Sequence, residues 1–240
     1  MKRLIVVFLA ILPMICMAID IDKPTRSAGD SVEENALNPR QQAIVAIASY
    51  SAIGDTDGLA IALVQGLDAG MTVNEIKELL IQVYAYCGFP RSLTALGVFK
   101  NLLSERRANG IADPEGESAA VVSDIDKYGQ GAETLSKLSG TPVDAPAPWY
   151  EDFAPGINCF LKEHLFADIF GRGVLPYTDR EIATVSMLTA LGGVEPMASG
   201  HIAICRHLGV TTPQLNSLLD IIEYNIGTSK TEPIRKIVNR

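Results

Sequence analysis

Cysteine is scarce in this chain, and the cysteines present are not arranged as a redox pair. The 240 residues include four, Cys16, Cys87, Cys159 and Cys205, and no Cys-x-x-Cys motif occurs. Enzymes that exchange disulfides or reduce peroxides commonly need one thiolate to attack and a second thiol to resolve the product. The sequence therefore disfavours two-cysteine redox chemistry, and buried, unreactive thiols are the simpler interpretation.

Histidine and basic residues are also too few for several classes of function. The three histidines, His164, His201 and His207, are not spaced as a metal-ligand set, and no phosphate-binding glycine loop occurs. Lys and Arg number 20 against 28 Asp and Glu, so the net charge is −8. Nucleic acids bind to basic patches. We therefore expect no metal site and no nucleic-acid partner.

The N-terminus is typical of an export signal. Lys2 and Arg3 precede an apolar core, residues 4–14, that is too short to span a bilayer comfortably. Small residues up to Ala18 suit a cleavage site, whereas the residues directly before Cys16 do not suit lipid attachment. We predict cleavage after Ala18, which leaves a periplasmic or extracellular protein of charge −10 with three cysteines and no membrane anchor.

Apolar residues recur at helical spacing through both halves of the chain, and nothing indicates a strand pair. Asn38 and Pro39 mark the first helix start. Thr178 and Glu181 have the spacing of a capping box. The predicted helices are Arg40–Ala52, Thr56–Ala69, Val73–Cys87, Pro90–Arg107, two short ones near Ser118–Asp126 and Gly131–Leu138, Phe153–Phe170, one from Thr178 to the break at Gly192-Gly193, one from Glu195 to Gly209, one from Thr211, and a short basic one from Thr231.

The two halves match at a constant offset of 139 residues. The matched pairs are Gly70 with Gly209, Thr72 with Thr211, Glu75 with Gln214, and Gly88 with Gly227. Matching caps and glycines at one offset predict an internal duplication. The predicted organisation is a signal peptide (1–18), a flexible lead-in (19–35), a first repeat (36–108), a linker (109–150), a second repeat (151–228) and a tail (229–240).

Two segments resemble the carboxymuconolactone decarboxylase family, which shares its all-helical fold with the alkylhydroperoxidase AhpD. They are SGHIAICRHLGVTTPQL (Ser199–Leu215) and GLDAGMTVNEIKELLIQVYAYCGFPRSLTAL (Gly66–Leu96). The resemblance implies an all-α, AhpD-like fold with tandem repeats. Members with one repeat per chain form rings of six, so a duplicated chain is expected to form a trimer.

The resemblance makes His201 the leading catalytic candidate, because the family places a histidine eight residues before the glycine that closes its helix, here Gly209. Histidine can transfer protons near neutral pH. The alternative is a core histidine with satisfied nitrogens. Glu181 would orient His201 or relay a proton, unless it only forms the capping box. The corresponding residues in the first repeat are Gln42 and Ala62.

A pocket wall is expected around Gly88, with Tyr86, Cys87 and Arg91 as substrate-binding candidates. Arg91 has the forked donors that bind a carboxylate. The alternatives are that the tyrosines fill the core and that Arg91 pairs with a surface acid. Glu195 is a further candidate, although its position at a helix start is favourable for an acidic residue without any other role. His164 is expected on a helix face or a subunit boundary, and His207 is expected to be exposed.

The redox branch of the family has Cys-x-x-Cys-x-x-x-His, and neither repeat of this chain has these thiols. The corresponding positions are Val194 and Met197 before His201, and Asp55 and Gly58 in the first repeat. One-cysteine peroxide chemistry at Cys87 or Cys205 is the remaining redox alternative.

The favoured function is that of an exported, cofactor-free enzyme. It would perform proton transfer or decarboxylation on a small carboxylate or lactone. The alternatives are a non-catalytic small-molecule-binding or scaffold protein of the same fold and, disfavoured by the missing thiols, an alkylhydroperoxidase-like antioxidant.

Overall fold

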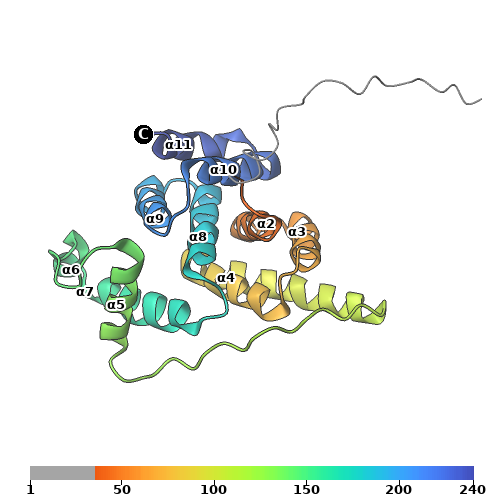
Figure 1. The fold of residues 1–240 in the computed structure, drawn as a ribbon, viewed down its shortest axis with the longest axis horizontal. Coiled ribbons are helices and arrows are strands. Elements are labelled where there is room, and N and C mark those ends of the chain that lie inside the picture. The colour runs from red at the N-terminus through yellow and green to blue at the C-terminus, as the bar shows by residue number, and fades with distance from the viewer. Residues whose placement is uncertain (1–35) are drawn as a thin grey trace, which may run out of the picture.

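The computed structural model describes residues 36–240, and every regular element in that range is helical (Figure 1). The predicted all-α class is thus confirmed, while the predicted signal and lead-in lie outside the described residues. No helix in this range is both long and apolar enough to cross a bilayer. The elements are α2 (Pro39–Ile53), α3 (Thr56–Asp68), α4 (Val73–Ala108), α5 (Lys127–Ser139), α6 (Trp149–Phe153), α7 (Pro155–Cys159), η1 (Phe160–Ile169), η2 (Phe170–Arg172), α8 (Tyr177–Leu191), α9 (Glu195–His207), α10 (Thr212–Ile226) and α11 (Thr228–Val238).

Three capping signals start helices as predicted. Asn38 caps α2, with a proline in the first turn. Thr72 and Thr211 cap α4 and α10 in reciprocal pairs with Glu75 and Gln214. Each pair satisfies backbone N–H groups that the helix itself leaves free, so the starts of these helices are specified locally.

The helices of the second half repeat those of the first at an offset of 139 residues, since α3 begins at residue 56 and α9 at residue 195 with equal lengths. The predicted break at Gly88 bends α4, and Gly227 separates α10 from α11. Both glycines adopt φ near +80 to +93° with ψ of 164 and 163°, a conformation that favours glycine. The bent α4 therefore corresponds to α10 plus α11, which begins slightly before the predicted Thr231.

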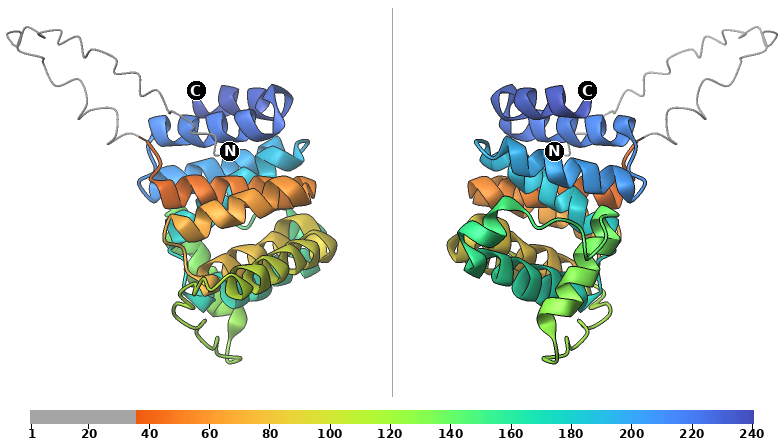
Figure 2. Two further views of the ribbon diagram at one scale, coloured as in Figure 1. Left: turned by 90° about the vertical axis from the view of Figure 1, so that its right-hand side faces the viewer. Right: turned by 90° about the vertical axis from the view of Figure 1, so that its left-hand side faces the viewer.

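The counterparts α2 and α8 pack together at the centre of the molecule, with α10 and α11 on one side and α4 on the other (Figures 1 and 2). Ile44 and Ile47 of α2 and Ile182 of α8 are fully buried members of one hydrophobic core. Arg40 forms an ion pair with Asp179, which occupies the corresponding position of the other repeat. The two repeats thus share one core.

The linker runs beside α4 and forms hydrogen bonds with the first turn of this helix. The carbonyls of Pro114 and Glu115 accept hydrogen bonds from the backbone N–H groups of Val73 and Asn74, each at 2.9 Å. The helix predicted near Ser118–Asp126 is wrong, because this segment has no helical structure and its backbone bonds to other elements instead.

The helix predicted near Gly131–Leu138 is confirmed within α5, which packs closely on η1. A Cβ at Gly131 would stand 1.8 Å from the Lys162 carbonyl oxygen, so only glycine permits this approach. The continuous helix predicted over Phe153–Phe170 is wrong. Pro155 cannot lie inside a helix without losing a backbone bond, so α7 begins there and continues into η1, a π-helix.

Candidate active site

Glu181 of α8 and His201 of α9 form a hydrogen-bonded pair. Nδ1 of His201 lies 2.7 Å from Oε2 of Glu181. The Glu181 side chain is fully buried, whereas the His201 side chain is 16 % exposed. The glycine-containing turn after α8 folds α9 back, so two residues that are 20 positions apart meet. The two catalytic candidates of the sequence therefore belong to one unit.

The predicted capping box between Thr178 and Glu181 is wrong. Helix α8 starts at Tyr177 after Pro176, and no side chain caps it. Glu181 is therefore the fifth residue of the helix, beyond the position from which a side chain can reach back to the N-cap. Its carboxylate points into the protein and meets His201.

The pair leaves one nitrogen of His201 available for chemistry. A carboxylate only accepts hydrogen bonds, so we assign the ring hydrogen to Nδ1. Nε2 makes no hydrogen bond within residues 36–240. It is not completely buried, so it keeps some access to solvent. In the neutral ring, Nε2 is the basic nitrogen, and the carboxylate holds the ring in that tautomer.

A buried arginine anchors the start of α8 beside Glu181. Arg180 is fully buried and donates to Gln82 Oε1 (3.1 Å), Gly173 O (2.9 Å) and Glu78 Oε2 (3.3 Å). Burial lowers the pKa of Arg180, and Glu78 opposes that shift. The carboxylate of Glu78 also binds Arg172. Sequence reasoning missed this cluster, although an acid within the apolar face of the Val73–Cys87 helix was a signal for it.

Two other side chains lie beside the Glu181–His201 pair. Tyr86, from the first repeat, meets the imidazole edge to face, with ring centroids 5.6 Å apart. Cys205 lies one turn further along α9 and is buried. Burial, with a further contribution from the Glu181 charge, raises the pKa of Cys205 well above its usual value, so Cys205 is present as a neutral thiol.

Arg91 and Cys87 are two further substrate-binding candidates. The Arg91 guanidinium lies against Gly54 at the end of α2, and no hydrogen bond or ion pair in the described residues joins Arg91 to His201 or Glu181. Cys87 is half-buried, and burial raises the pKa of its thiol to about 11, against an opposing effect of Arg91.

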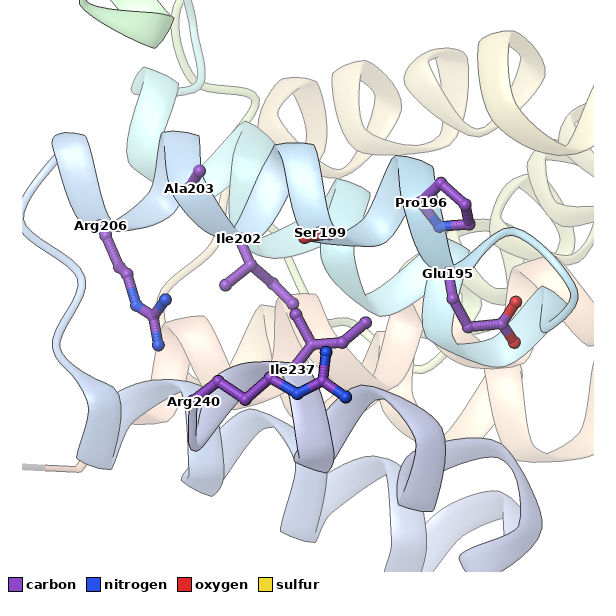
Figure 3. Close-up of a pocket in the computed structure, with 8 residues that line it drawn as sticks. All are labelled: Glu195, Pro196, Ser199, Ile202, Ala203, Arg206, Ile237 and Arg240. Atoms are coloured by element: carbon purple, nitrogen blue, oxygen red, sulfur yellow. The ribbon is translucent and has the colours of Figure 1, made fainter.

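Glu195 lies at the start of α9, where Oε1 accepts a hydrogen bond from the Gly193 N–H at 3.0 Å. It also lines an open groove of about 450 Å³ between α9 and α11, together with Ser199, Arg206 and Ile237 (Figure 3). His201 does not line this groove. Glu195 thus stabilises the turn before α9 and is separated from the histidine pair.

The other histidines make different contacts. Nδ1 of His164 lies 3.1 Å from Asp168 Oδ2, and its ring meets Tyr84 edge to face. His207 is exposed, as predicted, and lies near Gly140 at the end of α5. Within residues 36–240, no group of three or more His, Cys, Asp or Glu residues is placed to hold a metal ion.

Comparison with known proteins identifies relatives of this chain. The model of the carboxymuconolactone decarboxylase family matches residues 22–101 and 155–238, more than half of the chain. The protein belongs to the carboxymuconolactone decarboxylase family. The chain is 26 % identical over 99 residues to the 4-carboxymuconolactone decarboxylase of Acinetobacter baylyi, which is 41 % of this chain and 73 % of that protein. The two matched segments overlap the two repeats, and the Glu181–His201 pair of this family member lies in the second segment.

The pair predicts a large effect of Glu181→Gln on the rate of any reaction in which His201 transfers a proton. The amide can still accept a hydrogen bond from Nδ1–H but cannot stabilise a charged imidazole, so we expect kcat to fall by about 10²-fold or more with KM little changed. Steady-state kinetics will measure this. Glu232→Gln, at an exposed ion pair on α11, is the control, and equal kcat values for the two variants would contradict the role of Glu181.

The raised thiol pKa values predict that peroxide does not consume Cys87 or Cys205. At pH 7 a thiol with a pKa of about 11, as for Cys87, is only about 10⁻⁴ ionised. Alkylation of Cys87 should accelerate about tenfold per pH unit up to that value, because only the thiolate reacts. Mass spectrometry after peroxide treatment and alkylation tests this, and loss of either thiol at pH 7 would revive the one-cysteine alternative.

Proposed function

We propose that this protein is an exported, cofactor-free enzyme that transfers a proton at the carbon next to a carboxylate or lactone carbonyl. His201 is the acid–base group, and Glu181 is its partner. The observation that carries the proposal is the 2.7 Å contact between a fully buried carboxylate and a partly exposed imidazole. The family relationship and the name of the Acinetobacter relative support a substrate with a lactone and a carboxylate.

The arrangement suits proton transfer in either direction. Nε2 of neutral His201 can accept a proton from carbon, and the resulting imidazolium is stabilised by the buried negative charge of Glu181. In a decarboxylation, the bond to the leaving CO₂ breaks, its electron pair moves towards a conjugated carbonyl, and protonated His201 delivers a proton to carbon. The carbonyl group of the substrate accepts the electrons. The protein therefore needs to supply only an acid and a site that accommodates the carbonyl oxygen.

The test is turnover by the purified protein that begins at Ile19. The substrates are 4-carboxymuconolactone, simpler carboxylated γ-lactones and β-keto acids. Turnover is measured as CO₂ release and as exchange of the carbon-bound hydrogen of the substrate in D₂O. We expect exchange or decarboxylation with at least one class. Absence of both would contradict the proposal and favour the alternative of a non-catalytic binding protein, which the residues Gln42 and Ala62 in the first repeat fit.

Export and assembly belong to the same proposal. Cleavage after Ala18 would leave a mature protein whose mass identifies the new N-terminus. A trimer of duplicated chains would have three times that mass by light scattering. An uncleaved chain or a monomer would each contradict the corresponding part.

A further inference from the structure

Tyr86 brings a phenol from the first repeat to His201 of the second. The two rings meet at 80° with centroids 5.6 Å apart. The Tyr86 hydroxyl is buried and makes no hydrogen bond within the described residues. The hydroxyl of Thr184, which lies near it, donates to the Arg180 carbonyl and accepts from the Gln82 amide, so it keeps one free lone pair. The hydrogen of the phenol is thus not used in any hydrogen bond of the described residues, and its ring lies against the imidazole.

Glu181, whose charge acts on Tyr86, has a second unpartnered atom. Oε2 contacts His201, but Oε1 is buried without a partner. Buried polar atoms in native proteins are normally satisfied by protein groups, water or a ligand. The Tyr86 hydroxyl and Glu181 Oε1 thus have free hydrogen-bonding capacity that a water molecule or a polar group of a ligand can take up.

The electrostatic surroundings keep the Tyr86 phenol protonated. Burial, followed by the charge of Glu181, raises the pKa of Tyr86, while Thr184 and Arg180 oppose the rise. A phenol that keeps its hydrogen is a donor, and a donor is required where an oxygen gains negative charge.

We propose that Tyr86 is a catalytic residue that donates a hydrogen bond to the substrate oxygen on which negative charge develops. The inference rests on the proposed acid–base role of His201. When Nε2 takes a proton from carbon, the C–H electron pair forms a C=C bond and the carbonyl pair moves to oxygen. Tyr86 hydrogen-bonds this oxyanion without transferring its own proton, and His201 returns the proton to complete the cycle. The ligand class is the enolate or enediolate of a small carboxylate-bearing carbonyl compound.

The duplication shows that this site exists once per chain. At the offset of 139 residues, Tyr86 corresponds to Asn225, while Ala62 and Gln42 replace His201 and Glu181. The equivalent place thus lacks the phenol, the imidazole and the carboxylate. The complete site combines Tyr86 of one repeat with the acid–base pair of the other, which a single repeat cannot supply from within itself.

The test compares Tyr86→Phe with the matched control Tyr84→Phe. Tyr84 lies on the same helix but stacks on Phe89, with centroids 4.1 Å apart, and meets His164 rather than His201. We expect Tyr86→Phe to lower kcat by about 10²-fold with KM changed by only a few-fold, and Tyr84→Phe to leave kcat unchanged. The Tm of Tyr86→Phe should not fall, because the variant removes a buried, unpaired hydroxyl. A fall in Tm that accounts for the lost activity would assign Tyr86 a structural role and overturn the inference.

Binding of oxalate, a planar dianion with the shape of an enediolate, provides a readout that does not need turnover. Calorimetric titration should show at least about tenfold weaker binding to Tyr86→Phe, as expected for losing a hydrogen bond to a charged group, and unchanged binding to Tyr84→Phe. If the wild-type protein turns over substrate and Tyr86→Phe keeps the same kcat and oxalate affinity, the inference about Tyr86 is overturned and the proposed function stands. Tyr86-dependent oxalate binding without turnover supports the donor role and rejects the proposed function. Absence of both turnover and oxalate binding rejects both.

Discussion

His201→Ala is expected to lower kcat by about 10²- to 10⁴-fold, the range that general acid–base catalysis contributes. The substitution removes the ring whose Nδ1 contacts Glu181 at 2.7 Å, and with it the Nε2 that carries the proton in the proposed reaction. The variant also leaves the fully buried Glu181 carboxylate without its hydrogen-bond partner, so we expect some loss of stability beside the loss of activity. Steady-state kinetics and thermal unfolding measured together will separate lost chemistry from lost structure.

The control for His201→Ala is His207→Ala, on the same helix but exposed. It should retain full activity. Added imidazole should restore part of the activity to His201→Ala, since a small base can enter the space that the ring vacates on its exposed side. Unchanged turnover in His201→Ala would remove His201 from the mechanism.

The second large effect is expected on stability. Glu78→Ala should lower the free energy of unfolding by about 3–5 kcal/mol, the range for removing one partner of a buried ion pair. The Glu78 and Arg180 side chains are 4 % and 0 % exposed. Without Glu78, the Arg180 guanidinium stays buried with only Gln82 and Gly173 as hydrogen-bond partners. Urea unfolding monitored by circular dichroism measures the change.

Two comparisons sharpen this prediction. Glu115→Ala removes an ion pair with Lys77 whose side chains are 64 % and 42 % exposed, and solvent screening limits its effect to about 1 kcal/mol or less. The double variant Glu78→Leu with Arg180→Met removes both charges and should recover much of the lost stability. A Glu78→Ala effect as small as that of Glu115→Ala would show that the cluster does not anchor α8.

The helix boundaries and the duplication could be predicted from the sequence because they depend on neighbouring residues. A cap such as Thr72 satisfies backbone groups within four residues, and a glycine such as Gly88 permits a positive φ that other residues avoid. These local signals recur at one offset in both halves, so the repeat can be recognised without knowledge of the tertiary contacts. The two wrongly predicted helices, near Ser118 and across Phe153–Phe170, occur where contacts from other segments or a proline override the apolar pattern. The third error, the capping box of Thr178 and Glu181, occurs where the helix starts one residue earlier than its cap signal.

By itself, then, the amino-acid sequence determined an all-helical, duplicated chain with His201 as its candidate acid–base residue. It left the role of Glu181 open, because the same Thr-x-x-Glu spacing suits a cap or an inward-facing carboxylate. Only the tertiary structure decided between them. Packing of α9 against α8 brings the imidazole to Glu181, and packing of the first repeat brings the Tyr86 phenol to the same ring. Such contacts depend on how helix faces meet across a shared core, which no local pattern encodes.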